Sequence, residues 1–392
     1  MKDFSIAGVR KDFEWEKDGR VVKTLYERLK MLEDKRKRRG GRYRLAALLV
    51  MIIVAKLSGV DEVRAMAEWI RYRAASFKPF LALKHDKTPH ATTISRVMNS
   101  AIDIDALESL VASYFKEQVA NDEALAIDGK TLCGTIESGQ TRGQHLLALY
   151  ATESSVVVGQ MSVEAKANEI VAAPVLLNSL PLTGRVITGD AMFAQHSLSK
   201  QIIEAHGDYL WIVKDNQPSL RAAIARLFTP EKSSDVHSAL RTDFQSASSS
   251  NKGHGRLEKR CLTSSALLNA YSDWEGIAQV FKIERQVTTL KSGLISLQVE
   301  YGLTSLSPER ASPADLLRLV RNHWHIENGL HYPRDVSLHE DDCRLRWPTA
   351  HRAMAILNNV TLGLIRQLDF PFVPSARRFL DANFLVAIHL VC

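Results

Sequence analysis

An apolar run that ends on an acid, Ala-Leu-Ala-Ile-Asp at residues 124–128, opens a part of the chain with strand-like texture. A second run, residues 185–188, leads into Gly189 and Asp190 in the same way. Short apolar runs bounded by glycine and polar residues predict buried strands. Acids at strand ends face the crevice where α/β sheets bind ligands. Asp128 and Asp190 are therefore candidate site residues.

The elements around these runs alternate between strands and helices. Two further strands are expected at 146–151 and 156–163, before alternating helices and strands at 168–180, 185–188, 195–205, 209–213 and 218–228. Three hairpin-joined strands followed by this alternation predict an α/β fold, a mixed sheet with flanking helices. Residues 231–300 look like a β-rich insertion, with strands at 261–263, 277–285 and 294–302. Its serine-rich stretch at 246–253 has the composition of a loop.

The two ends of the chain have helical sequence patterns. Residues 1–120 form an all-α domain, because 45–60, 63–74 and 107–119 repeat apolar residues at helical spacing. Residues 92–97 open a short helix that fits a helix-turn-helix with Arg96 facing DNA, although other helical bundles show the same pattern. Ser312, Pro313 and Asp315 mark the start of a helix that runs to Glu327. The domain that contains the candidate acids is expected at 121–370, and an irregular tail at 371–392 follows it.

Positive charge is concentrated near the N-terminus. The chain has 392 residues and a net charge of +7, and its first 44 residues hold 15 Lys and Arg against 8 Asp and Glu. Such a cationic run is either a solubilising loop or an arm that gains from releasing counterions on a polyanion. On the second interpretation the DNA-contacting residues are Lys35, Arg36, Lys37, Arg38 and Arg39.

Several classes of protein are disfavoured by composition. With 45% hydrophobic and 24% charged residues the chain is of ordinary globular type. The four cysteines form no CxxC pair, so neither a disulfide framework nor a zinc knuckle is expected. The longest apolar stretch, 45–55, is too short to cross a membrane, and the N-terminus does not resemble a secretory signal. We therefore expect a soluble, cytoplasmic protein without a membrane partner.

A third acid, Glu327, projects from the same side of its helix as the apolar stripe. Together with Asp128 and Asp190 it could hold Mg²⁺, which prefers oxygen ligands, and two such ions would suit phosphodiester chemistry. The residues alone leave this open, because a strand-end Asp is often a turn former and Glu327 could pair with Arg321 or Arg334. A zinc site built on His323, His325 and His331 is a further alternative, although the sequence contains no HExxH.

Six motifs in a fixed order resemble a known family. The chain is similar to the DDE transposases of bacterial insertion sequences, specifically the ISAs-type or H-repeat-associated group. The resemblance covers about residues 120–346, and the helical N-terminal segment resembles the domain that accompanies this family. The matching stretches lie at residues 126–131, 166–170, 188–192, 213–217, 254–258 and 323–332.

The resemblance implies a ribonuclease H-like core, interrupted by an insertion before the last acid, with Asp128, Asp190 and Glu327 as catalytic and metal-binding residues. It implies Mg²⁺ or Mn²⁺, two ions in all, and a reaction that hydrolyses the element's ends and transfers the freed 3′-hydroxyl to target DNA. The partner would be double-stranded DNA, on which at least a homodimer is expected. Further DNA-contacting residues would be Lys130, Lys214, Asn216, Gln217 and Arg334.

Two positions depart from the family's pattern. Cys133 stands where arginine is expected, and Phe193 with Ala194 replaces the usual Gly-Cys. Neither change removes an acid, so metal binding is still expected. The alternative function is a catalytically decayed or repurposed sequence-specific DNA-binding protein.

Overall fold

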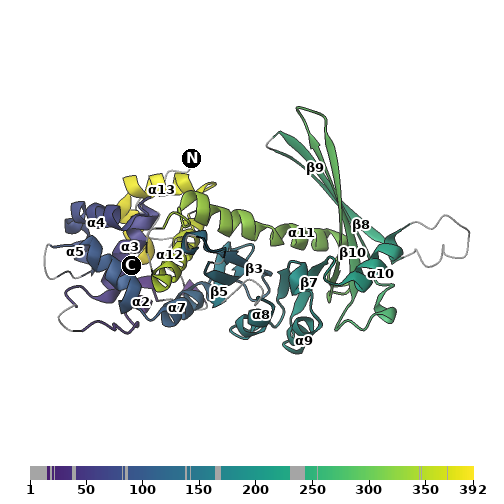
Figure 1. The fold of residues 1–392 in the computed structure, drawn as a ribbon, viewed down its shortest axis with the longest axis horizontal. Helices are drawn as coiled ribbons and strands as arrows, with labels where there is room; N and C mark the ends of the chain where they lie inside the picture. Colours follow the sequence, from purple (N-terminus) through teal and green to yellow (C-terminus); the bar gives the residue numbers. More distant parts are fainter. Residues whose placement is uncertain are drawn as a thin grey trace, which may run out of the picture.

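A mixed sheet of nine strands runs through the centre of the molecule, with helices at one end and a β-rich arm at the other (Figure 1). The computed structural model describes residues 23–37, 41–81, 83, 87–136, 139–141, 143–163, 169–229, 243–253, 255–343, 345, 347–368 and 370–392. It also describes the backbone of a two-stranded ribbon, β1 (Glu16–Lys17) and β2 (Arg20–Val21).

The first five strands of this sheet have the ribonuclease H-like arrangement that the resemblance predicts. Their order is β5-β4-β3-β6-β7. Strands β3, β4 and β5 form an antiparallel meander, whereas β6 and β7 run parallel to β3. The strands are β3 (Leu125–Thr131), β4 (His145–Ala151), β5 (Val156–Val163), β6 (Val186–Gly189) and β7 (Asp208–Val213).

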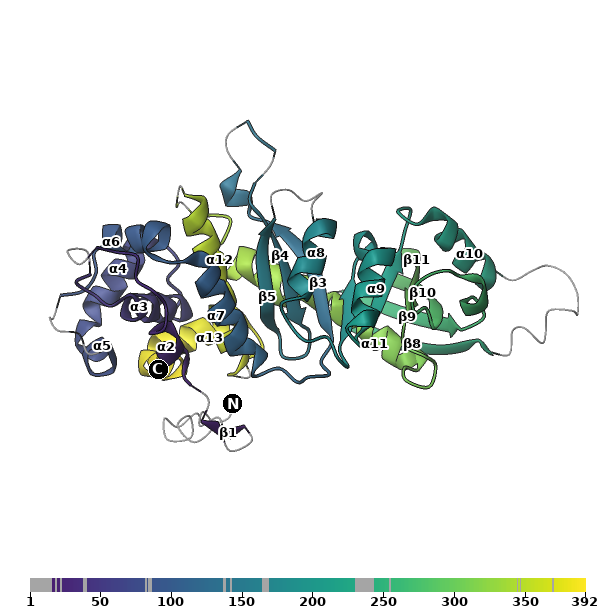
Figure 2. The ribbon, with the colours of Figure 1, turned by 90° about the horizontal axis from the view of Figure 1, so that it is seen from below.

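Helices cover both faces of these strands, which is why their apolar runs are nearly continuous. Helices α8 (Glu169–Leu177) and α9 (His196–Glu204) contact one face, and α11 (Pro313–His323) contacts the other (Figure 2). The Ser312 side chain accepts a hydrogen bond from the Asp315 backbone, and Asp315 caps Ser312 in return. The predicted start of this helix is therefore confirmed. Its predicted end is wrong, because the regular helix stops at His323 and Glu327 lies in a following π-helical turn.

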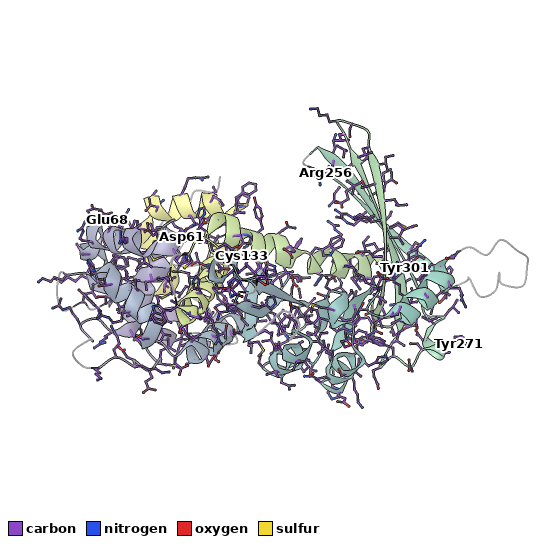
Figure 3. The ribbon with its side chains drawn as sticks, viewed as in Figure 1. Asp61, Glu68, Cys133, Arg256, Tyr271 and Tyr301 are labelled. Carbon is purple, nitrogen blue, oxygen red and sulfur yellow. The ribbon has the colours of Figure 1, made fainter. Side chains whose placement is uncertain are left out.

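The insertion extends the same sheet instead of forming a separate body. Strand β11 pairs with β7 only at Tyr301–Thr304, and beyond that point the strands continue as an arm that projects past α11, with Arg256 near its tip (Figure 3). Helix α10 (Pro218–Phe228) packs against the base of the arm. The strands are β8 (Gln245–Gly253), β9 (Arg256–Ser265), β10 (Gln279–Thr289) and β11 (Ile295–Thr304).

The loop expected at 246–253 is instead strand β8. It pairs with β9 in unbroken antiparallel register from Gln245↔Ser264 to Gly253↔Arg256. Serine has little intrinsic preference for strands, but β-propensity depends on context, and an edge strand needs no apolar face when its neighbour supplies the backbone partners. Composition alone therefore concealed this strand.

The helical end of the molecule is built from both ends of the chain. Helix α3 is buried at all 13 positions, enclosed by neighbours that include α14 and α13. The predicted irregular tail is thus wrong, because 373–391 is almost entirely helical. The helices are α2 (Leu25–Leu29), α3 (Leu45–Leu57), α4 (Val63–Tyr72), α5 (Ala74–Leu81), α6 (Ala91–Arg96), α7 (Ile104–Lys116), α12 (Pro348–Arg366), α13 (Val373–Ala382) and α14 (Phe384–Val391).

Within the described residues, no helix combines the length and apolar composition needed to cross a bilayer. The short helix expected at 92–97 is present as α6, and Arg96 at its end is exposed. Its contact with DNA stays a prediction.

Candidate active site

The register of two parallel strands places the first two predicted acids side by side. Strand β3 pairs with β6 so that Ile127 lies opposite Gly189. Asp128 and Asp190 are the next residues on each strand, and neighbouring strands lie about 4.8 Å apart. The sheet therefore brings these two backbone positions together from sites 62 residues apart in the sequence.

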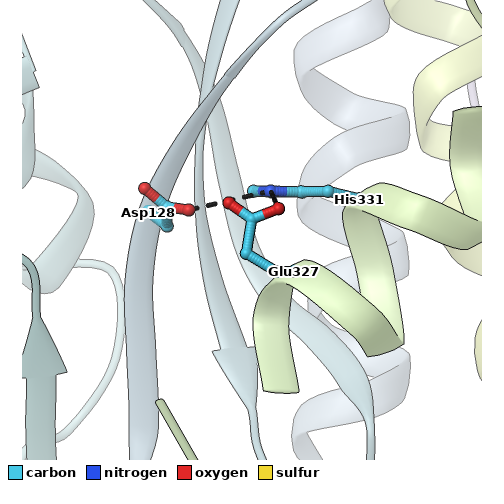
Figure 4. Close-up of side chains that lie close together, drawn as sticks. All are labelled: Asp128, Glu327 and His331. Atoms are coloured by element: carbon cyan, nitrogen blue, oxygen red, sulfur yellow. Dashed lines mark ion pairs between the residues drawn. The ribbon is translucent and has the colours of Figure 1, made fainter. Parts of the chain in front are cut away.

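The third predicted acid approaches from the helical layer. Glu327 begins the π-helical turn η8 (Glu327–His331) that follows α11, and it points toward Asp128 (Figure 4). His331, at the end of this turn, places its Nδ1 atom 3.7 Å from Asp128 Oδ2 and 3.6 Å from Glu327 Oε2. Ligand atoms of Asp128, Glu327 and His331 all lie within 4.8 Å of one another. π-Helical turns are frequent at functional sites.

The electrostatics of the two clustered carboxylates differ. Burial raises the pKa of Asp128 to about 6, although His331 and a hydrogen bond from the Gly129 backbone, at 2.8 Å, oppose the rise. The interaction with His331 holds the pKa of the more exposed Glu327 below its usual range. The cluster thus contains a carboxyl group that would gain from a nearby cation, and the His331 ring lies within hydrogen-bonding or ion-pair range of both acids.

Asp190 lies outside this compact group, as the structure stands. Its exposed carboxylate is 3.4 Å from Lys214 Nζ, and the same lysine is 3.8 Å from Glu300. Lys214 therefore meets one of the predicted acids, as a residue close to the site should. The role of Asp190 as the third acid stays a prediction supported by its register beside Asp128.

Asn216 and Gln217 bind protein backbone in this structure. The Asn216 amide donates to the carbonyl of Ala191 at 2.5 Å, and the Gln217 amide donates to that of Ala194 at 3.0 Å. Both carbonyls belong to the segment directly after Asp190. These side chains hold the Asp190 loop in place, and a direct contact with DNA is not needed to explain them.

Three of the other predicted DNA contacts also have protein partners. Lys130 Nζ lies 2.6 Å from Asp335 Oδ2, and Lys35 Nζ lies 2.8 Å from Asp103. Arg334 is 1% exposed and forms a buried ion pair with Glu340, so its guanidinium faces the protein interior.

The rest of the basic run is only partly described. Arg36 pairs with Asp34 and donates to the Tyr43 carbonyl, and Lys37 is exposed. Arg38 and Arg39 lie outside the described residues, as do parts of the motifs at 166–170 and 254–258. DNA contact by this run stays a prediction.

A buried histidine–carboxylate pair lies beneath the site, on the other face of the sheet. His145 Nε2 and Glu169 Oε1 are 2.7 Å apart, and His145 Nδ1 contacts the Thr131 hydroxyl at 2.9 Å. A Cβ atom added to Gly129 would come within 2.5 Å of both partners, so a glycine is required there. Glu169 belongs to the stretch 166–170 that resembles the family, but nothing in the sequence links it to His145.

The three histidines of the zinc alternative do not converge in the described part of the chain. His323 is buried against Thr188, with 3.2 Å between Nδ1 and Oγ1, and burial lowers its pKa to about 4. His325 is exposed, and only His331 joins the two acids. The observed donors are two carboxylates and one imidazole. This set suits Mg²⁺ or Mn²⁺, because carboxylate oxygens are the donors that these ions prefer, and it is not the three-histidine set of the zinc alternative.

The strand order β5-β4-β3-β6-β7 defines the central sheet as ribonuclease H-like, and sequence comparison gives the family. The Transposase DDE domain family matches residues 120–364, and the DDE_Tnp_1-associated family matches residues 26–115. The chain belongs to the DDE transposase family.

Named relatives agree with this membership. The chain is 28% identical to the Escherichia coli K12 protein "H repeat-associated putative transposase YhhI", over 94% of this chain and 98% of the relative. It is 30% identical to "Putative transposase YncI" of Escherichia coli O157:H7, over 88% of each. A solved piggyBac transposase synaptic complex with hairpin DNA aligns with a TM-score of 0.43 at 12% identity, over 98% of this chain and 80% of that one.

Proposed function

We propose that this protein is an active insertion-sequence transposase that binds the ends of its element and catalyses metal-dependent DNA cleavage and strand transfer. The observation that carries the proposal is the convergence of Asp128 and Glu327, from β3 and from the turn after α11, within reach of one metal ion. Family membership supplies the reaction class.

Asp128, Glu327 and, by its register, Asp190 would hold Mg²⁺ or Mn²⁺. When bound, the metal supplies a Lewis acid for the phosphorus centre and lowers the pKa of the attacking water or 3′-hydroxyl. The protein's own part is to fix these carboxylates on rigid elements. Lys214 orients the exposed Asp190, and Asn216 with Gln217 fixes the loop that follows it. The ends of two elements must meet for strand transfer, so we expect a homodimer or higher oligomer on double-stranded DNA.

The first test is cleavage of labelled DNA that carries the sequences flanking this gene, with Mg²⁺, with Mn²⁺ and with EDTA. Metal-dependent nicks at the element boundary are expected, and Asp128→Asn, Asp190→Asn and Glu327→Gln should each abolish them. Specific binding of the ends without any metal-dependent product would instead favour a decayed or repurposed DNA-binding protein.

A second readout does not depend on activity. A ligand that binds the native state alone raises the melting temperature. Mn²⁺ should therefore stabilise the wild-type protein and have a much smaller effect on Asp128→Asn. The matched control is Asp105→Asn, at an exposed acid on α7 that does not belong to the cluster. Equal stabilisation of all three proteins would remove Asp128 from the metal site.

A further inference from the structure

A second polar cluster lies between the β arm and the C-terminal end of α11. Three side chains from adjacent arm strands form one row across the sheet, because Ser249 pairs with Arg260 and Arg260 pairs with Arg285. From the helix side, Trp324 lies against this row, with its ring centroid 5.9 Å from the Arg260 guanidinium carbon and 5.5 Å from that of Arg285. We call these residues, together with Arg321, the arginine cluster.

The arginine cluster holds more positive charge than its acids neutralise. Glu258 is the acid shared by Arg260 and Arg285, with 2.7 Å between Arg260 Nη2 and Glu258 Oε2. Arg321 also reaches the cluster, since its Nη2 atom lies 2.9 Å from the amide of Asn251 on β8. Two of the three guanidinium groups therefore share one carboxylate, and the third binds a neutral amide.

Arg260 is buried with part of its hydrogen-bonding capacity unused. Its side chain is 9% exposed, and Nε and Nη1 have no acceptor among the residues that the structure describes. The hydroxyl of Ser249, its neighbour in the row, is also buried and has no partner in that part of the chain. Unpaired buried donors are costly, and a cation is more so, although stacking on Trp324 offsets part of the penalty. Such a group in a native fold calls for an explanation, and a missing anion supplies one.

The arginine cluster faces the same side of the sheet as the predicted acids. Side chains alternate along a strand, and the pairings of the nine strands place Asp128, Lys214 and Arg285 on the face covered by α11. Contacts connect the two regions, because Lys214 lies near both Asp190 and Glu300, and Arg285 donates to Gln298, two residues from Glu300. Trp324 precedes Glu327 by three residues, about 4.5 Å along a helix.

We propose that Arg260, Arg285 and Arg321 bind one phosphodiester group of the DNA strand that Asp128 and Glu327 engage, with Trp324 as the floor of the site. The planar guanidinium presents a fork of N–H donors that matches two phosphate oxygens. The arm joins the rest of the sheet through four residues of β11, and a small tilt of the arm away from α11 is the part of this proposal that gives a phosphate access to the unused donors of Arg260. This proposal rests on the proposed function, because it takes the substrate DNA as the ligand.

The test measures the affinity of the full-length protein for element-end DNA as a function of salt, in EDTA so that no cleavage occurs. Each phosphate contact contributes about 0.9 to the slope of log affinity against log salt. Arg260→Gln should lower the affinity roughly tenfold to a hundredfold and reduce this slope by about one contact. Arg256→Gln is the matched control, since Arg256 is an exposed arginine on the same strand near the arm's tip (Figure 3).

A second measurement keeps the proposal testable if Arg260→Gln is destabilised. Arg260→Lys keeps the charge but loses the fork, and DNA with a single neutral methylphosphonate can be scanned across the cleavage site. A methylphosphonate at one position should weaken the binding of the wild type and of Arg256→Gln strongly, and that of Arg260→Lys clearly less. If every methylphosphonate affects all three proteins equally, the phosphate site is refuted. If the wild type fails to bind DNA at all, the proposed function itself fails, and this site with it.

Discussion

The burial of His323 should make the stability of the fold depend on pH. It is 7% exposed, and its pKa is lowered to about 4 by burial, against the opposing pull of Asp190 and Glu327. The unfolded chain takes up a proton near pH 6.5, whereas the folded chain does not until about pH 4. The stability associated with the neutral ring is therefore complete above pH 6.5 and is lost as the pH falls toward 4, by on the order of 3 kcal/mol.

The measurement is the free energy of urea unfolding of the metal-free protein between pH 7 and pH 4.5. His323→Asn keeps a polar group near Thr188 but cannot titrate, so its stability should fall less steeply with acid than that of the wild type. Parallel curves for the two proteins would show that His323 titrates in the folded state as it does in water.

Gly129 is the second residue with a defined structural demand. Its missing side chain makes room for Glu169 and His145, which are buried and bonded to each other and so cannot move aside. Gly129→Ala should destabilise the fold by about 1–3 kcal/mol through overpacking. Gly253→Ala, where a Cβ atom meets nothing within 4 Å, should have little effect on the urea midpoint. A neutral Gly129→Ala would mean that the His145–Glu169 pair is not held rigidly.

Which site residues the sequence could predict depends on how far apart in the sequence the interacting residues lie. Asp128 and Asp190 were found because each ends an apolar run, which is a local signal. His331 was considered only for the zinc alternative and the His145–Glu169 pair was not expected, because their positions depend on how a π-helical turn and two distant segments pack. Arg334 was expected at DNA because related transposases carry a basic residue seven residues after the last acid, and this resemblance does not predict its burial with Glu340.

At the scale of the element, the segment after η8 is held by one buried ion pair. Arg334 and Glu340 are 1% and 4% exposed at their side chains, and Glu340 also accepts from Asn358 of α12 at 2.7 Å. Arg334→Met leaves Glu340 charged and without its main partner, so we expect a loss of about 3–5 kcal/mol in the free energy of unfolding.

Arg318→Met is the matched control for that substitution. Arg318 pairs with Glu153 at 2.9 Å, but both side chains are more than half exposed. Exposed pairs contribute about 0–1 kcal/mol, so this variant should unfold almost as the wild type does. If both variants lose the same stability, the Arg334–Glu340 pair has no special structural role. In that case its position seven residues after Glu327 would again favour a DNA contact.

Element prediction succeeded where a strong local pattern coincided with burial. The predicted strand at 156–163 and helix at 218–228 have the observed bounds, and the capping residues placed the start of α11. Strand β8 was missed because its serines carry no apolar alternation, and only pairing with β9 makes it a strand. From the sequence, Ser249 was placed in a loop, Arg260 just before a predicted strand, Arg285 at the end of another strand, and Arg321 with Trp324 in a helix.

At the scale of the whole molecule, the chain's last residues complete the packing of its first helices. Helix α3 is apolar around its whole circumference, which is typical of a helix buried on all sides. Helices α13 and α14 supply part of this enclosure, and Arg377 of α13 donates to the Lys56 carbonyl and pairs with Asp61. The C-terminal helices thus pack with the N-terminal helices into one body, which a reading in chain order does not reveal.

Substitutions in α14 test whether this enclosure holds the molecule together. Ile388 is 0% exposed, whereas Leu385 on the same helix is 41% exposed. Ile388→Ala should lower the free energy of unfolding by about 2–5 kcal/mol through lost burial and a cavity, and Leu385→Ala should lower it much less. Because α14 packs on α3, the loss should appear in the same cooperative transition that unfolds the N-terminal helices. A transition in which α14 melts alone, with the rest of the protein unchanged in stability, would show that the C-terminal helices are an appendage and not part of the core.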